Sequence, residues 1–205
     1  MVRHGKTPTT GTVLPGRAPG LHLSDEGQAQ AEAVAQRISV LAEGTAHPPV
    51  AVYASPLERT VETARPIARR LGLRVRTDKG LLECEFGQWT GAELKELAKR
   101  PEWANVQRFP STFRFPGGES FAEMQARMTS TIVRLTSQHP GETVVLVSHA
   151  DPIKAAVASA AGTHLDLFQR LTVSPCSVSA LAYTEGGPHV LSVNSTSSLT
   201  ELGLS

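Results

Sequence analysis

The sequence predicts an α/β protein: a three-layer α/β/α sandwich built around a mostly parallel central sheet. Patterns of apolar residues that suit helices alternate along the chain with short apolar strands, as in repeated βα units. Residues 143–148 are nearly all apolar, which is typical of a strand buried on both faces. No linker divides the chain, so we expect residues 1–205 to form a single domain that ends in a polar tail, 195–205.

The first part of the chain provides helix and strand patterns in alternation. Residues 24–41 form an amphipathic helix pattern, and Ser24 is placed to cap its amino end. Residues 50–54 are a short apolar strand. A second helix follows, with Ser55 as the expected cap, and Pro66 is expected to kink or split it.

The middle of the chain is expected to be less regular. Residues 73–77 suit another strand. Thr90 and Glu93 have the spacing of a capping box, which predicts a helix up to about residue 100. Residues 101–118 contain three prolines and two glycines, so we expect a long, lid-like loop there.

The last part returns to regular elements. Ser120 and Glu123 form a second capping box, ahead of a helix with an apolar face. After the strand at 143–148, a further helix is expected to begin at Asp151. Residues 178–183 and 189–193 alternate like the two strands of a closing hairpin.

Composition excludes several classes of protein. The net charge is +1, which gives no electrostatic case for nucleic acid or a membrane surface, and no run of about 18 apolar residues is present. The start of the chain does not match a secretion signal. Cys84 and Cys176 form no CxxC pair, which favours a cytoplasmic protein and argues against a disulfide framework or a structural zinc site.

The start of the chain is unusual, because only two residues precede Arg3, whereas a buried strand usually needs about five. We therefore expect the natural chain to begin several residues upstream, with an apolar strand. The alternative is an edge-like stub, which would destabilise the sheet.

Polar residues follow the predicted strands at their carboxyl ends. Arg3 and His4 follow the first apolar residues, His149 follows the strand at 143–148, and Arg59 lies early in the helix after residues 50–54. In open α/β sheets, ligands bind at this edge. Two arginines and two histidines would bind a phosphoryl group there through charge-assisted hydrogen bonds.

The predicted chemistry also follows from motifs that the sequence lacks: a Walker-type loop, a Cys-x5-Arg loop and an obvious carboxylate set for magnesium. A neutral imidazole can then serve as the nucleophile and become a phosphohistidine. The leaving alkoxide still needs a proton, which a carboxylic acid near the phosphate can supply, contributing on the order of 10²–10⁴-fold. We expect no metal and no cofactor.

Six short motifs occur in a fixed order between about residues 2 and 150. They are Arg3-His4-Gly5-Lys6-Thr7, Leu23-Ser24-x-x-Gly27, Ala54-Ser55-Pro56-Leu57-x-Arg59, Leu82-Glu83-x-x-Phe86-Gly87, Gly117-Gly118-Glu119-Ser120 and Val147-Ser148-His149. In these motifs the chain resembles the histidine phosphatase superfamily, the phosphoglycerate mutase-like proteins, and above all small actinobacterial members described as predicted phosphomutases.

The resemblance implies a role for each matching residue. His4 corresponds to the phosphorylated nucleophile. Glu83 corresponds to the general acid or base, and Glu85 is the alternative proton donor. Three residues correspond to the phosphate pocket: Arg3, Arg59 and His149.

At other positions the residues are similar to those of family members, but some of them differ. Thr7, Thr10 and Arg17 fall where members add phosphate or loop contacts, but Thr10 replaces an asparagine found in many members. Ala150 and Asp151 follow His149 where Gly-Gly or Gly-Asp is common, which narrows the space beside the phosphate.

Three functions remain open on the sequence. We favour a metal-independent phosphomonoester hydrolase with a small phosphorylated substrate, acting as a monomer or a homodimer, with no nucleic-acid or membrane partner. A bisphosphate-dependent phosphoglycerate mutase is the alternative, although the resemblance implies that true mutases are longer, with an insertion that closes the site. The third function is the binding of a phosphorylated ligand without turnover.

Overall fold

The structure, a computed structural model, describes residues 1–197. Within this range six strands form one sheet in the order β3-β2-β4-β1-β5-β6. The pairs among the first four are parallel, whereas β1–β5 and β5–β6 are antiparallel, so the mostly parallel sheet is confirmed. The strands are β1 Val2–Arg3, β2 Pro49–Ala54, β3 Val75–Thr77, β4 Thr143–Ser148, β5 Val178–Thr184 and β6 Gly187–Ser195.

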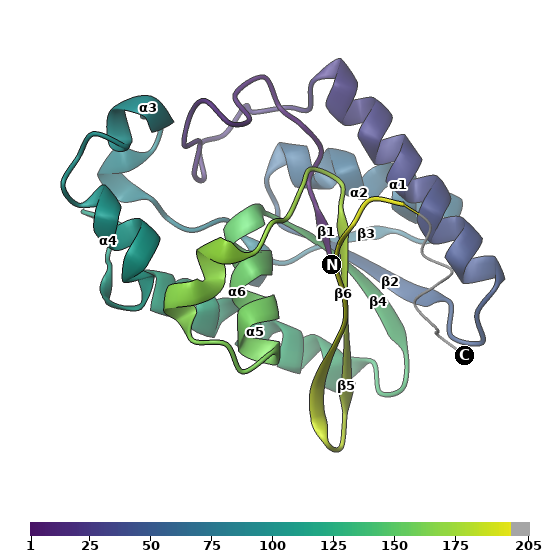
Figure 1. The fold of residues 1–205 in the computed structure, drawn as a ribbon. Coiled ribbons are helices and arrows are strands. Elements are labelled where there is room, and N and C mark those ends of the chain that lie inside the picture. Colours follow the sequence, from purple (N-terminus) through teal and green to yellow (C-terminus); the bar gives the residue numbers. More distant parts are fainter. Residues whose placement is uncertain (198–205) are drawn as a thin grey trace.

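Helices cover both faces of the sheet (Figure 1). α1 and α2 pack on each other over one face, and α5 and α6 pack on each other over the opposite face. The α-helices are α1 Asp25–Glu43, α2 Glu58–Arg70, α3 Leu94–Leu97, α4 Trp103–Arg108, α5 Phe121–Gln138 and α6 Ala150–Ala160. Short 3₁₀ turns lie at Lys79–Leu81, Gly87–Trp89, Pro110–Thr112 and Leu165–Arg170.

β4 shows why the sheet needs cover on both sides. Val145 and Val147 lie in the core that also contains residues of α1 and α2, whereas Leu146 lies in the core that contains residues of α5. Successive side chains of a strand point to opposite faces, so an unbroken apolar strand requires a helical layer on each side. The predicted three-layer sandwich is confirmed.

β1 lies inside the sheet although it has two residues. Val2 pairs with Val147 of β4 and with Val178 of β5, and it is buried. The edge-like stub considered from the sequence is therefore wrong, because β1 has a neighbouring strand on each side. The backbone N–H of His4 continues the ladder to the carbonyl of Ser148 at 2.9 Å, which holds His4 beside the carboxyl end of β4.

The helix caps agree in part with the sequence. Ser24 caps α1, and Ser120 and Glu123 form the predicted capping box of α5. α2, in contrast, begins at Glu58. Ser55 does not cap it, because the Ser55 hydroxyl is hydrogen-bonded to His149 instead. Pro66 lies inside α2 without splitting it.

The capping box predicted at Thr90 and Glu93 is wrong. The helix that follows, α3, has four residues, and Glu93 makes no capping hydrogen bond. Main-chain bonds hold this segment against the loop near Leu14: the N–H of Leu14 donates to Ala92 O at 2.9 Å. A helix therefore cannot begin at Thr90.

Residues 101–118 are not the long loop that their prolines and glycines predict. They contain α4 and a 3₁₀ turn. Phe113 and Phe115 are buried against Trp89, and Trp103 stacks on Trp89 with ring centroids 6.4 Å apart. These aromatic contacts supply the apolar burial that orders the segment, which lies with α3 to one side of the sheet (Figure 1).

The closing hairpin is confirmed, and its strands are slightly longer than predicted. The expected tail from residue 195 begins on the last residue of β6, and residues 198–205 lie outside the described part of the chain. Among the helices of residues 1–197, we find none with the length and apolar character needed to cross a membrane.

Candidate active site

The carboxyl ends of β1 and β4 and the start of α2 bring the predicted polar residues together. His4 and His149 face each other edge to face, with ring centroids 5.2 Å apart. Arg59 reaches them from the first turn of α2, and its NH2 group lies 3.2 Å from Nδ1 of His149. His4 is 6% exposed, whereas Arg59 and His149 are fully buried. The strand ends thus assemble a compact, buried cluster, as the sequence predicts.

His4 is a neutral imidazole with a free lone pair on Nε2. Its Nδ1 lies 2.8 Å from the carbonyl oxygen of Gly5, and because a carbonyl can only accept, Nδ1 carries the proton. Burial, followed by the charges of Arg59 and Arg3, lowers the pKa of His4 to about 3. At neutral pH the ring is therefore uncharged, and Nε2 has the electron pair that a nucleophile needs.

His149 has the opposite tautomer. Arg59 can only donate, so Nδ1 of His149 accepts from it, and Nε2–H donates to the hydroxyl of Ser55 at 2.9 Å. Burial and the charge of Arg59 hold the pKa of His149 well below its usual value. Sequence reasoning assigned Ser55 to a helix cap and missed this contact, because no local pattern links residues so far apart.

Both arginines have buried donors that the protein does not use. Arg59 donates from NH2 to Gly16 O at 2.8 Å, and Arg3 donates from NH1 to Val173 O at 2.6 Å. Within residues 1–197, Nε and NH1 of Arg59 and Nε of Arg3 are buried without a hydrogen-bond partner. Burial lowers the pKa of each arginine. Leaving such donors unsatisfied is costly, so this arrangement is typical of a site for an anion.

Glu83 is the buried carboxyl group of the cluster. It is 8% exposed, and its Oε1 accepts the backbone N–H of Cys84 at 2.9 Å. Burial, and next the charge of Asp151, raises the pKa of Glu83 to about 7, although the hydrogen bond and the two arginines oppose this shift. A large fraction of the group is protonated at neutral pH, as a proton donor requires.

Glu85, the alternative donor, has a different environment. Its side chain is 38% exposed and lies 3.5 Å from the guanidinium of Arg17. A general acid must lie close to the reacting oxygen, and Glu83 is buried in the cluster, whereas the Glu85 carboxylate is partly exposed and lies beside Arg17. The geometry therefore favours Glu83 over Glu85.

The additional contacts predicted from the resemblance lie in the loop after β1. Thr7 and Thr10 bond to each other, from Thr7 N to Thr10 Oγ1 at 2.8 Å. Arg17 donates to the carbonyl of Glu83 at 2.8 Å and to the carboxylate of Glu119 at 2.9 Å. A direct role in substrate binding stays a prediction for these three residues.

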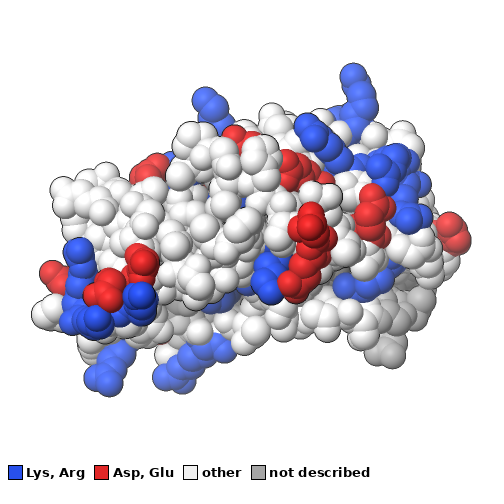
Figure 2. Space-filling model, turned by 90° about the horizontal axis from the view of Figure 1, so that it is seen from above, with Lys and Arg blue, Asp and Glu red and all other residues white. Residues whose placement is uncertain are grey.

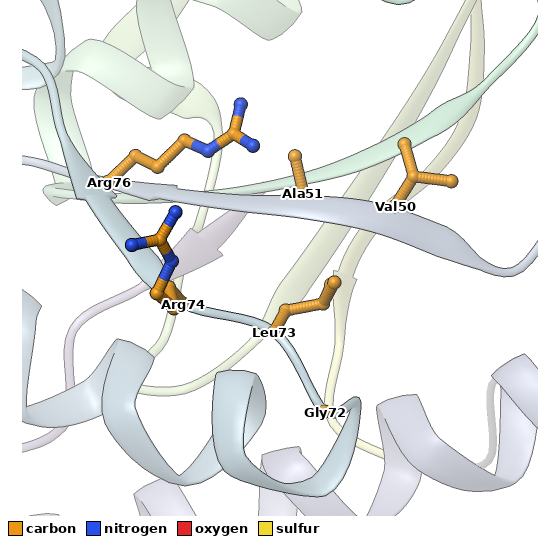
Figure 3. Close-up of a pocket in the computed structure, with 6 residues that line it drawn as sticks. All are labelled: Val50, Ala51, Gly72, Leu73, Arg74 and Arg76. Carbon is orange, nitrogen blue, oxygen red and sulfur yellow. The ribbon is translucent and has the colours of Figure 1, made fainter.

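One cavity in the described chain lies away from this cluster. It measures about 170 Å³ and is formed at the amino end of β2 and the end of α2 (Figure 3). The histidines lie at the carboxyl end of the sheet, so this cavity is not the reaction site. Its lining is Val50, Ala51, Gly72, Leu73, Arg74 and Arg76.

Two further properties bear on the ligand. Among residues 1–197, no group of three or more His, Cys, Asp or Glu side chains is arranged to hold a metal ion. On the face drawn in Figure 2, acidic and basic side chains are interspersed, as the net charge of +1 suggests.

Comparisons with known proteins agree with this geometry. A sequence model of the histidine phosphatase superfamily (branch 1) matches residues 1–196. Phosphoserine phosphatase 1 of Hydrogenobacter thermophilus is 32% identical over 194 residues, which cover 91% of this chain and 88% of that protein. The probable phosphoglycerate mutase GpmB of Yersinia enterocolitica is 30% identical over 187 residues, covering 90% and 84%. The structure of a mycobacterial glucosyl-3-phosphoglycerate phosphatase superposes with a TM-score of 0.83 at 26% identity, covering 96% of this chain and 97% of that one.

Proposed function

The chain belongs to the histidine phosphatase superfamily, and from this premise we propose that it hydrolyses phosphomonoesters through a phosphohistidine on His4. One observation supports this assignment most strongly. A neutral imidazole with a lone pair on Nε2 lies beside buried guanidinium donors of Arg3 and Arg59 that no group in residues 1–197 satisfies. Nucleophile and phosphate pocket are thus present together.

In the first step, Nε2 of His4 attacks phosphorus, and the bond from phosphorus to the ester oxygen breaks. Arg3 and Arg59 stabilise the charge that develops on the phosphoryl oxygens, and His149 holds the Arg59 guanidinium in place through its Nδ1. The carboxylic acid of Glu83 gives its proton to the leaving oxygen, so the alcohol departs neutral.

In the second step, water attacks the phosphorus of the phosphohistidine. The carboxylate of Glu83 takes a proton from that water, the bond from phosphorus to nitrogen breaks, and inorganic phosphate leaves. His4 regains its lone pair and Glu83 its proton, so the cycle closes with one ester and one water consumed. No metal enters either step.

The test is release of phosphate from 4-nitrophenyl phosphate by the purified protein in EDTA. We expect His4→Ala to lose activity, and the exposed histidine variant His189→Ala to retain it. Quenching in base during turnover of a ³²P-labelled ester should trap label on the wild-type protein, and none on His4→Ala. Activity of His4→Ala equal to that of the wild type would overturn the assignment.

The substrate is proposed to be a small phosphorylated metabolite. The names of relatives suggest phosphoserine and glucosyl-3-phosphoglycerate as the first compounds to assay. Cys84 and Cys176 are free thiols within the described chain, which fits the cytoplasmic location expected from the sequence. Sedimentation of the purified protein would distinguish a monomer from a homodimer.

A phosphoglycerate mutase is the second candidate, because a probable mutase is among the relatives. A mutase must protect its phosphohistidine from water and return the phosphate to the substrate. Conversion of 3- to 2-phosphoglycerate that depends on added bisphosphate would establish this activity. Phosphate release without any conversion, at high enzyme concentration, would exclude it, and calorimetric binding without release would favour a ligand-binding protein.

A further inference from the structure

The segment after Glu83 is held by a second segment, 116–119, which runs directly against it. Gly118 allows this approach: a Cβ there would lie 2.2 Å from the carbonyl oxygen of Glu85. Main-chain bonds link the two segments, from Glu119 N to Glu85 O at 2.8 Å and from Gln88 N to Pro116 O at 2.9 Å. The Gly-Gly-Glu-Ser motif, which the reaction itself does not use, is thus explained by this contact.

The carboxylate of Glu119 joins two arginines from distant elements. Its Oε2 accepts from NH2 of Arg17 at 2.9 Å, and Arg127 of α5 binds both oxygens, through Nε at 2.8 Å and NH2 at 2.9 Å. Oε2 also accepts the backbone N–H of Glu85 at 3.2 Å. Burial acts to raise the pKa of Glu119, but these partners outweigh it and lower the pKa, so the group is a carboxylate.

The remaining donors of the two arginines converge on the backbone that precedes and includes Glu83. Arg17 Nε and Arg127 NH2 both donate to the carbonyl of Glu83, at 2.8 and 3.3 Å. Arg127 NH1 donates to the carbonyls of Gly80 and Leu82, at 2.8 and 2.9 Å. The network therefore fixes the main chain on which the Glu83 side chain stands.

We propose that Arg17, Glu119 and Arg127 are positioning residues for the proton donor of the reaction. This inference rests on the proposed role of Glu83. It also gives Arg17 a task other than the substrate contact expected from the resemblance, because its Nε and NH2 groups are engaged within the protein. None of the three needs to touch the substrate.

Positioning has a distinctive kinetic signature. A general acid must lie within about 2.6–3.2 Å of the oxygen that it protonates, so a small displacement of the Glu83 backbone reduces proton transfer. An alkyl phosphate, whose leaving group is a strong base, depends on this proton, whereas 2,4-dinitrophenyl phosphate has a leaving group that departs without it. Loss of positioning should therefore affect the alkyl ester and spare the activated one.

The experiment measures kcat/KM for both esters in the wild type, Glu119→Gln and Glu83→Gln, because kcat/KM reports phosphoryl transfer to His4 and not the later hydrolysis that the two esters share. For Glu119→Gln we expect a loss of about 10–100-fold on the alkyl ester and less than about threefold on the dinitrophenyl ester. Glu32→Gln is the matched control, because Glu32 also lies between two arginines, Arg69 and Arg70, but on the outer surface of α1. It should leave both rates unchanged.

Equal losses on the two esters, or no loss on the alkyl ester, would overturn the inference. Glu83→Gln distinguishes a failure of the positioning inference from a failure of the proposed function. If the Glu83→Gln variant shows no preference for the activated ester, Glu83 is not the proton donor. If Glu119→Gln does not fold, Arg127→Lys decides the matter. It keeps a positive charge beside Glu119 but cannot reach the three carbonyls together, so the same preference is expected.

Discussion

Replacing Arg59 with methionine should remove most of the activity and leave the fold intact. The guanidinium is fully buried, and its Nε and NH1 groups find no partner in residues 1–197, so both are placed to bind the phosphoryl group. Removal of one donor that stabilises transition-state charge costs about 10²–10³-fold in kcat. Two adjacent donors do not act independently, so we expect a total loss of about 10³–10⁴-fold.

The same substitution should change the free energy of unfolding by no more than about 2 kcal/mol. It removes two buried donors whose desolvation is uncompensated, each costing about 1–3 kcal/mol. It also leaves the carbonyl of Gly16 and Nδ1 of His149 without their donor, at a similar cost. Methionine fills the space with an apolar chain, and such replacements of buried charges are often neutral.

The assay combines turnover of 4-nitrophenyl phosphate with thermal unfolding, in the presence and absence of inorganic phosphate. A ligand at about 100 times its Kd stabilises the wild type by about 2.7 kcal/mol, and Arg59→Met should gain none of this at the same concentration. The unfolding temperature without phosphate should stay within about 4–8 °C of the wild type. A variant that keeps a tenth of the wild-type kcat, or one that unfolds far earlier, would refute this reasoning.

Four other predictions concern the proton donor and the residues that support the site. Because burial raises the pKa of Glu83 to about 7, kcat/KM, corrected for ionisation of the substrate, should fall above pH 7, and Glu83→Gln should lose this limb; a rate that climbs to pH 9 contradicts it. The raised pKa also means that stability falls as pH rises from about 4.5 through 7, since the folded chain holds this proton more tightly, and denaturant titrations at several pH values will show it. Gly118→Ala would bring a Cβ within 2.2 Å of a carbonyl oxygen, so it should lower the unfolding temperature and the activity, whereas Gly186→Ala, with its nearest atom at 3.6 Å, should do neither. Ser55→Ala removes the acceptor of His149 Nε2–H and should cost about 1–3 kcal/mol of stability, with a lower kcat; unchanged melting would show that this bond is unimportant.

Much of the cluster was predictable because a general rule of sheets places strand ends together. His4 and His149 were assigned to one edge from the apolar residues that precede them, and they lie with ring centroids 5.2 Å apart. The choice of Glu83 came from the resemblance, and its burial is a property of the folded chain. The sequence was enough to predict features that depend only on neighbouring residues, such as the capping box at Ser120.

The features that the sequence did not predict depend on contacts between distant segments. Glu119 and Arg127 are separated by eight residues from each other but hold a backbone more than thirty residues away. Prolines in 101–118 favoured a loop, because the prediction could not include the burial of Phe113 and Phe115 against Trp89. In each case tertiary packing overrides the local preference.

The two-residue strand β1 has a consequence for how the protein becomes active during synthesis. Its partners are Val147 and Ser148 on one side and Val178 on the other, so the ladder that holds His4 joins the start of the chain to positions translated far later. A ribosome that adds about 5–20 residues per second needs several seconds to reach them. The nucleophile is therefore synthesised before the strands that position it, and a nascent chain that ends before β4 and β5 has no assembled site. Such long-range pairing is also a reason to expect slow folding.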